Sequence, residues 1–290
     1  MSELLKDSED FISFIHPKTP RLLFIRNWLS ERNIESSVIS LENKNHIFIR
    51  FPQSQYNPTF KIKTVIAHYD RVAESEGAND NSFAVFTLMN WALRLSKSNT
   101  THNIRLILTD GEEAANGLNS QGAFHLAGFL QKLGIAQDEV YVFDCMGRGN
   151  IPVLCDTKLP FEASPVFKKS VKKMEEKTMR LLKSASSDCL TLPASYSDNA
   201  GFIARGIPAV TITMLPSDEI EAYMKLLMKT KIKKVEDLNQ PRFRKDYETL
   251  YPKTWRLINS ENDKKETLTA ESQGIFEKIL ENLATLKTLS

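Results

Sequence analysis

The sequence predicts an α/β protein built on a largely parallel sheet. Three short apolar runs support this prediction, at residues 64–67, 104–109 and 140–143. Runs of this kind, separated by helical stretches, are typical of strands buried on both faces of a parallel sheet. Each run stops at a residue type that binds metals, and ligands of such sheets bind beyond the carboxyl ends of the strands. The pattern therefore indicates a metal site at one edge of the sheet, and a hydrolase.

The other elements follow from apolar periodicity and from turn residues. A helix is expected over 22–30, followed by two antiparallel strands over 37–41 and 46–51 around a turn at 43–45. A further core strand is expected over 209–214, and further helices are expected over 83–95, 122–133, 164–182, 219–228 and 270–286. Serines at 164 and 217 are expected to cap two of these helices.

Length and composition predict one domain over residues 1–290. The 290 residues are 41% hydrophobic and 26% charged, as is ordinary for a soluble globular protein. Residues 230–253 are charged, interrupted by prolines and without clear period, so a surface insertion is expected at about 217–253.

Charge and cysteine content restrict the partners and the compartment. The net charge of +2 argues against a nucleic-acid partner. No apolar stretch is long enough to span a bilayer, and the N-terminus lacks the features of a signal peptide. The three cysteines show no CxxC spacing, which argues against a disulfide framework. We therefore expect a cytoplasmic, reduced protein without a membrane partner; the oligomeric state stays open.

The first and third runs end at candidate metal ligands. His68 and Asp70 lie two residues apart, so on a continuing strand their side chains share a face. His68 is then a candidate ligand and Asp70 a candidate acceptor that fixes the imidazole tautomer, unless the pair only caps a turn. Asp144 directly follows four apolar residues and needs a partner, either a metal or Arg148.

Three more acidic residues have both a functional and a structural interpretation. Asp80 lies in the small-residue loop 77–81, where it either bridges metals or caps the following helix. Glu112 and Glu113 are adjacent, so their side chains diverge and can take separate roles as general base and metal ligand. Alternatively, the pair is a solvated acidic start of a helix.

Five blocks of the sequence resemble, in order, the signature blocks of the M28 family of zinc aminopeptidases. They cover residues 64–214 and read IAHYD, GANDN, TDGEEAANGLNSQGAFHLA, VFDCMGRG and YSDNAGFIARGIPAVTIT. The resemblance implies a three-layer αβα sandwich with a mixed, mostly parallel central sheet. By position, it implies that His68 and Asp144 hold one zinc, and that Asp80 bridges to a second zinc held by Glu113. Glu112 would be the general base.

One ligand position departs from the family. Residues 255–263 resemble the closing block of the family, in which a histidine binds the second zinc, and Asn259 stands at that place. An amide oxygen is neutral and a weak zinc ligand compared with imidazole. We therefore expect one tightly held zinc and a second ion that is weak or absent, with manganese or cobalt as alternative metals.

Three functions remain open at this point. The leading hypothesis is a metal-dependent exopeptidase of the aminopeptidase type, acting on a peptide with a free N-terminus, with Glu112 as general base. Glutaminyl-peptide cyclotransferases share similar blocks, but their single zinc needs the histidine that Asn259 replaces. A catalytically degenerate binding protein would explain Asn259, although it has no evident reason to keep so many costly polar groups in one place.

Overall fold

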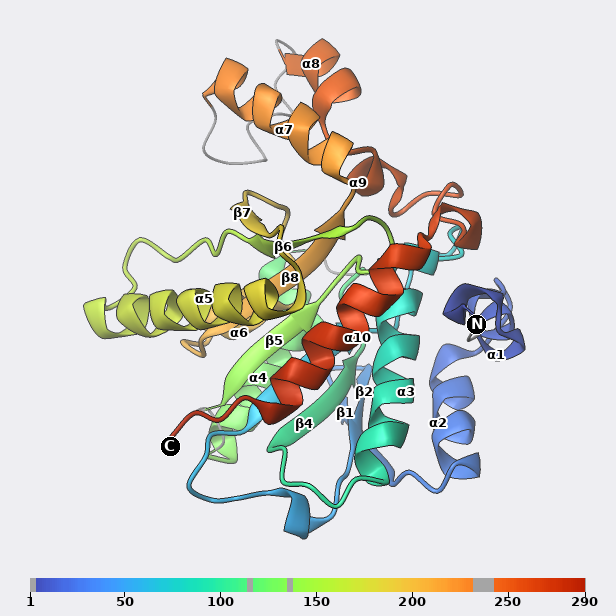
Figure 1. Ribbon diagram of the computed structural model, residues 1–290. Coiled ribbons are helices and arrows are strands. Elements are labelled where there is room, and N and C mark those ends of the chain that lie inside the picture. The colour runs from blue at the N-terminus through green and yellow to red at the C-terminus, as the bar shows by residue number, and fades with distance from the viewer. Residues whose placement is uncertain (1–3, 114–116, 135–137, 232–242, 290) are drawn as a thin grey trace.

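The computed structural model describes residues 4–113, 117–134, 138–231 and 243–289. Its centre is an eight-stranded mixed sheet with the strand order β1-β2-β4-β3-β5-β8-β6-β7, covered by helices on both faces (Figure 1). The strands are β1 (Ser36–Leu41), β2 (Lys44–Ile49), β3 (Lys63–His68), β4 (Ile104–Thr109), β5 (Glu139–Phe143), β6 (Ile151–Cys155), β7 (Leu190–Leu192) and β8 (Ala209–Leu215).

The helices alternate with these strands along the chain. They are α1 (Glu9–Ile15), α2 (Arg21–Glu31), α3 (Phe83–Ser96), α4 (Gly122–Lys132), α5 (Pro165–Ala185), α6 (Asn199–Ala204), α7 (Ser217–Thr230), α8 (Arg244–Leu250), α9 (Lys253–Leu257) and α10 (Ala270–Thr285). None of the helices in the described part of the chain is long and apolar enough to cross a membrane.

The pairing of the strands is mixed and mostly parallel. The pairs β3–β4, β3–β5, β5–β8 and β6–β7 are parallel. The pairs β1–β2, β2–β4 and β6–β8 are antiparallel. With helices on both faces, this confirms the expected αβα sandwich with a mixed, mostly parallel sheet.

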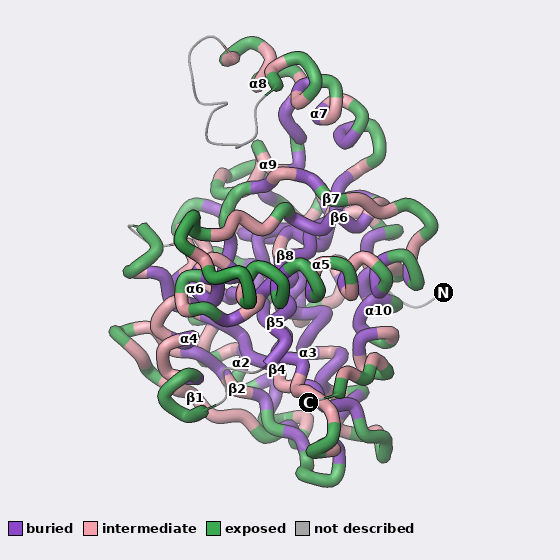
Figure 2. The backbone as a smooth tube through the Cα atoms, turned by 90° about the vertical axis from the view of Figure 1, so that its left-hand side faces the viewer, coloured by how far each residue is buried: buried purple, intermediate pink, exposed green. Residues whose placement is uncertain are grey.

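Alternating residues of the central strands face two separate cores, as the two-residue period of a strand requires. On β3, Val65 and Ala67 belong to the core beneath α3 and α10, whereas Ile66 belongs to the core beneath α4 and α6. Figure 1 shows α3 and α10 on the near face of the sheet and α4 behind it. The central strands β3, β4, β5 and β8 are buried almost throughout, and the exposed positions lie mainly on helices and loops (Figure 2).

The first two strands form a hairpin with a shorter turn than expected. Glu42 and Asn43 alone make the turn, with φ of 46° and 64°. Positive φ at both central residues is the geometry of the tight turn that matches the twist of a two-residue hairpin. The second strand ends at Ile49 rather than at residue 51.

Six of the described helices and strands have no counterpart among the expected ones: α1, α6, α8, α9, β6 and β7. Strand β6 contains Pro152, a residue that removes a ladder donor and argues against a strand when only the sequence is read. Strand β7 has three residues, too few for periodicity to reveal it. Of the two expected caps, Ser164 accepts a hydrogen bond from the backbone N–H of Phe167, but Ser217 caps nothing because α7 starts directly after Pro216.

The segment expected to be an insertion includes α7 and α8, which stand at the top of Figure 1, away from the sheet. Residues 232–242 lie outside the described part of the chain. Tyr223 of α7 packs edge-on against Tyr251 and Trp255, with ring centroids 5.6 and 5.4 Å away. This aromatic cluster joins the segment to the core around β6 and β8.

Candidate metal centre

His68 is the last residue of β3 and lies at the centre of a group of carboxylates. The side chain is fully buried, with 0% of its surface exposed. Its Nε2 atom lies 3.1 Å from Oδ1 of Asp80 and 3.6 Å from Oδ1 of Asp144. Its Nδ1 atom lies 3.5 Å from Oδ1 of Asp70. His68, Asp70, Asp80 and Asp144 were all predicted from the sequence to belong to the site, and the structure brings these four side chains together.

Asp80 lies in the π-helical turn η3 (Ala78–Ser82), between β3 and α3. The backbone N–H groups of Asn79 and Asp80 donate to the two carboxylate oxygens of Asp263, at 2.8 and 3.0 Å. Asp263 therefore holds this turn in place from the far end of the chain. The N-cap of α3 is Ser82, so the interpretation of Asp80 as a helix cap is wrong.

Glu112 and Glu113 follow β4 after a turn at Gly111, which has a φ of 83°. Their backbone N–H groups donate to the two carboxylate oxygens of Asp70, at 3.3 and 3.0 Å. Asp70 thus contacts His68 and also fixes the backbone of the acidic pair. Both glutamates are half-buried rather than fully solvated.

Asp144 comes directly after β5, and its backbone N–H donates to Ile212 O on β8. The Cys145 thiol donates to Asp144 Oδ1 at 3.4 Å. The alternative of a salt bridge from Asp144 to Arg148 is wrong, because Arg148 pairs with Glu219 at 2.9 Å. The sequence could not distinguish these partners, since Glu219 is 71 residues further along the chain.

The raised pKa values of several acidic side chains in the cluster indicate that the cluster holds too little positive charge to compensate them. Burial raises the pKa of Glu113 to about 9, and the charge of Asp80 adds to this effect. Burial also raises the pKa of Asp80, and that of Glu112 well above its usual range. Burial alone would lower the pKa of His68, but its contacts with Asp144 and two further carboxylates outweigh burial and raise it. A cation among these groups would compensate the crowded negative charge.

The donor atoms of the cluster fit a divalent metal. One ligand atom from each of His68, Asp80 and Asp144 lies within 4.8 Å of the others, and the same holds for His68, Glu112 and Glu113. Both imidazole nitrogens and Oε1 of Glu113 are buried and make no hydrogen bond to the described residues. Imidazole nitrogen and carboxylate oxygen are ligands of zinc. Both of these sets of potential ligands therefore include His68.

Sequence reasoning missed Asp198, which lies in the loop before α6 and is fully buried. Thr109, at the end of β4, donates its hydroxyl to Asp198 Oδ2 at 2.5 Å. Burial raises the pKa of Asp198 to about 7, and its charge acts on His68 and Asp70. The residue lies within the block that resembles the M28 family, but an aspartate before a short helix also has the form of an N-cap. Its side chain makes no cap hydrogen bond to α6.

Asn259 is exposed and has a left-handed backbone, with a φ of 58°. Its neighbour Ile258 lines a small cavity together with Asp144, and Asp263 holds the turn that carries Asp80. The closing block therefore lies beside the candidate metal centre, as its resemblance to the closing block of the family implies. The role of Asn259 as a ligand stays a prediction.

Two cavities adjoin the cluster. One, here called the Asp144 cavity, has a volume of about 80 Å³ and is lined by Asp144, Cys145, Cys155, Ala194, Ser195, Tyr196, Ser197, Thr211, Thr213, Tyr251, Trp255 and Ile258. The other, here called the Glu112 cavity, has a volume of about 610 Å³ and is lined by Glu112, Gly117, Leu118, Gln121, Lys158, Leu159, Pro160, Tyr196, Ala200, Ile203 and Ala204. Tyr196 lines both.

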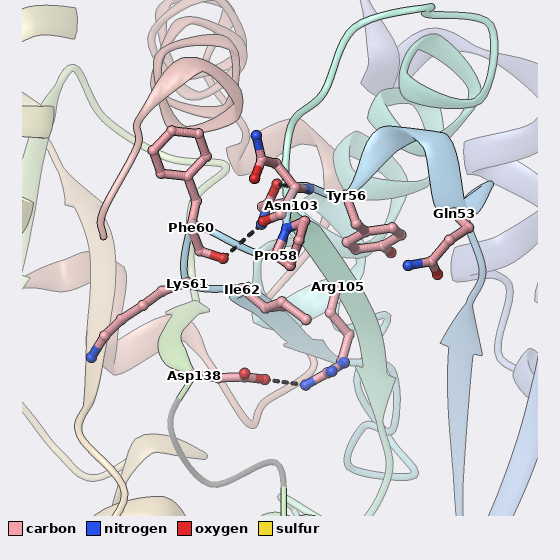
Figure 3. Close-up of a pocket in the computed structure, with 10 residues that line it drawn as sticks. Gln53, Tyr56, Pro58, Phe60, Lys61, Ile62, Asn103, Arg105 and Asp138 are labelled. Atoms are coloured by element: carbon pink, nitrogen blue, oxygen red, sulfur yellow. Dashed lines mark hydrogen bonds and ion pairs between the residues drawn. The ribbon is translucent and has the colours of Figure 1, made fainter. Parts of the chain in front are cut away.

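A further cavity of about 470 Å³ lies at the opposite edge of the sheet, before the amino ends of β3, β4 and β5 (Figure 3). Several of its polar side chains are paired with one another or with backbone groups. Arg105 pairs with Asp138, and Asn103 donates to the carbonyls of Asn57 and Phe60 at 2.8 Å. This cavity is therefore separate from the metal centre, which lies at the carboxyl ends of the same strands.

A sheet that gathers one histidine and several carboxylates at the carboxyl ends of its strands is suited to metal-dependent hydrolysis. The sequence matches the model of peptidase family M28 over residues 49–269, and the chain belongs to this family. Comparison with the curated proteins finds no match.

Solved structures with the same fold include peptidases and a cyclase. The LapA aminopeptidase of Legionella pneumophila is 15% identical, with a TM-score of 0.66 over 99% of this chain and 73% of that one. A Zn-dependent exopeptidase of Parabacteroides distasonis is 12% identical, with a TM-score of 0.63 over 98% and 99%. The glutaminyl cyclase of Porphyromonas gingivalis is 13% identical, with a TM-score of 0.62 over 97% and 98%. These likenesses concern the fold.

Proposed function

We propose that the protein is a metal-dependent exopeptidase of the aminopeptidase type that hydrolyses the N-terminal bond of peptides. The observation that supports this best is the position of Glu112 and Glu113 next to the group formed by His68, Asp80 and Asp144. A general base beside a cation site is what hydrolysis by an activated water requires. Membership of peptidase family M28 supports the same reaction class.

The residues divide the work between binding the metal and moving the proton. His68, Asp80 and Asp144 would hold a divalent cation, which would supply a Lewis acid able to polarise the peptide carbonyl and to lower the pKa of water. Glu112 takes the proton of the attacking water and delivers it to the leaving amine. Asp70 keeps Glu112 in position because its carboxylate accepts a hydrogen bond from the backbone N–H of Glu112.

The function is tested by assaying aminoacyl-p-nitroanilides with zinc, manganese or cobalt. We expect turnover by the metal-loaded protein and a fall in kcat of about 10²–10⁴-fold in Glu112→Gln, the usual contribution of a general base. The zinc content of the variant should stay unchanged, because the three proposed ligands of the first ion remain. Glu248→Gln, at an exposed position of α8, is the matched control. A folded, metal-loaded protein without turnover would instead favour a binding protein.

Cyclisation of an N-terminal glutamine is the second candidate, because the fold of the P. gingivalis glutaminyl cyclase matches this chain almost end to end. A peptide with N-terminal glutamine distinguishes the two reactions. The peptidase releases free glutamine, whereas a cyclase releases ammonia and leaves a pyroglutamyl peptide of otherwise equal length.

A further inference from the structure

The two cavities beside the metal centre differ in size and in character. The lining of the Asp144 cavity is mostly buried and contains several hydroxyl groups. The lining of the Glu112 cavity is mostly exposed or half-buried and largely apolar, with Leu118, Leu159 and Ile203 among its side chains. Because a peptide chain continues only on one side of its N-terminal residue, the two cavities can receive different parts of a substrate.

The inner end of the Asp144 cavity is polar. Thr211, on β8, is 3% exposed, and its hydroxyl lines the cavity without a hydrogen bond to any residue that the structure describes. Ser197 is 2% exposed and lines the same space. A buried hydroxyl without a partner loses free energy relative to water, so a ligand that supplies the missing hydrogen bond gains affinity.

Aromatic rings form another part of the lining of the Asp144 cavity. Tyr251 and Trp255, whose ring centroids lie 5.6 Å apart, line it from the α8–α9 side. The cavity has a volume of about 80 Å³. An apolar cavity of about 150 Å³ holds a benzene ring, so this space is too small for a phenyl side chain. A methyl or hydroxymethyl group fits.

We propose that the Asp144 cavity receives the side chain of the N-terminal residue and selects small residues, alanine and serine above leucine and phenylalanine. The Glu112 cavity, which is larger and open, then takes the chain that follows the scissile bond. Thr211 provides the hydrogen bond that favours serine, and Trp255 sets the limit on side-chain length. This inference rests on the proposed peptidase function and names its substrate class.

The first test measures binding as well as turnover. Calorimetry on the zinc-loaded protein compares L-alanine, L-serine, L-leucine and L-phenylalanine, and the matching aminoacyl-p-nitroanilides are assayed in parallel. We expect the two small amino acids to bind more than 10-fold tighter than the two large ones, with the same order in kcat/KM. Tighter binding or faster turnover of leucine or phenylalanine overturns the selection for small residues, as does turnover that does not depend on the N-terminal residue.

Variants of the cavity provide the second test. Thr211→Val keeps the shape and removes the hydroxyl, so the preference for serine over alanine should fall about fivefold, the value of one hydrogen bond. Thr191→Val makes the same change at an exposed threonine outside the cavity and should leave the preference unchanged. An unaltered preference in Thr211→Val contradicts the role of this hydroxyl.

Trp255→Ala enlarges the cavity and should raise the binding of leucine relative to alanine by about 10-fold. Trp255 also packs on Tyr223, so Ile258→Ala, which enlarges the cavity from another side, is the second variant if the first fails to fold. Selection for small residues in calorimetry, without hydrolysis of any substrate, would support the cavity assignment and reject the peptidase. Hydrolysis with a preference for large residues would do the reverse.

Discussion

Among the described residues, His68 is the one side chain that belongs to both sets of potential metal ligands. It lies at the end of β3, and its imidazole lies among carboxylates from three other segments of the chain. A single imidazole cannot neutralise these groups, and the raised pKa values of Asp80 and Glu113 are the consequence of burial with too little positive charge. A bound cation would therefore stabilise the ionised form of the site.

At the residue scale, the resemblance to the family places Asn259 where a histidine ligand is expected, and this predicts unequal affinities for two metal ions. We expect metal analysis after dialysis to find one zinc ion per chain, with a second that binds only when zinc is added in excess. Asn259→His should tighten the second ion, because imidazole is a better zinc ligand than an amide oxygen. Calorimetric zinc titration of both proteins measures this difference. Two equally tight ions in the unaltered protein would contradict the prediction.

At the scale of elements, the turn η3 depends on a residue from the other end of the domain. Asp263 is 1% exposed and accepts from the backbone N–H groups of Asn79 and Asp80. The position of Asp80 is therefore determined by a contact over 183 residues of sequence. This contact couples the closing block to the first cation position.

Asp263→Asn should weaken both stability and metal binding. The amide keeps the size of the carboxylate but removes a charged acceptor from two backbone donors, and hydrogen bonds to charged groups contribute roughly 1.5–3 kcal/mol. We expect the free energy of unfolding in urea to fall by about 2 kcal/mol, with weaker zinc binding. Asp188→Asn, at an exposed position, is the control. Normal zinc affinity in a destabilised Asp263→Asn would show that η3 keeps its position without this contact.

At the scale of the whole molecule, we expect a metal ion bound at the candidate centre to contribute to stability, because the candidate ligands come from segments far apart in the chain. Removal of the ion leaves buried carboxylates facing one another without compensation. We expect a chelator to lower the melting temperature by several degrees, since a ligand at 100 times its Kd stabilises the folded state by about 2.7 kcal/mol. Added zinc should restore it. A melting temperature that stays constant while metal analysis confirms removal would contradict the prediction.

Acid sensitivity is a second property of the whole molecule. His102 is 3% exposed; its Nε2 lies 3.0 Å from Gln55 Oε1, and its Nδ1 accepts from the backbone N–H of Ile104 at 3.0 Å. Burial, with a smaller effect of Lys63, lowers the pKa of His102 from 6.5 to about 4. The unfolded chain therefore binds more protons than the folded one between these pH values. The contribution of neutral His102 to the free energy of unfolding is therefore fully present above pH 6.5 and is lost as the pH falls towards 4.

Urea unfolding at pH 7 and at pH 4.5 measures this loss. His102→Gln cannot be protonated, so its stability should depend less on pH, by about 1–2 kcal/mol over this range after allowance for solvent screening. An unchanged dependence on pH in the variant would exclude His102 as a cause.

Much of the sheet was predictable because strands that are buried on both faces consist largely of consecutive apolar residues, as in β3, β4, β5 and β8. The candidate metal centre was predictable because metal-binding residue types follow three of these strands, and ligands of a parallel sheet bind beyond the carboxyl ends of its strands. Strand β6 was not predictable because it contains a proline, and strand β7 was not predictable because it has only three residues. Asp198 was missed because the pattern around an aspartate before a helix is the same for a cap and for a buried acid.

The sequence by itself determined the class of fold, the ligand-type residues and their order, because apolar periodicity and strand ends are local properties of the chain. Only the tertiary structure decided that Arg148 pairs with Glu219 rather than with Asp144, and that Asp263 holds the turn carrying Asp80. It also decided the size of the Asp144 cavity, whose walls come from β6, β8, α9 and the loop before α6. These properties depend on distances between segments far apart in the chain, and such distances exist only once the sheet has formed.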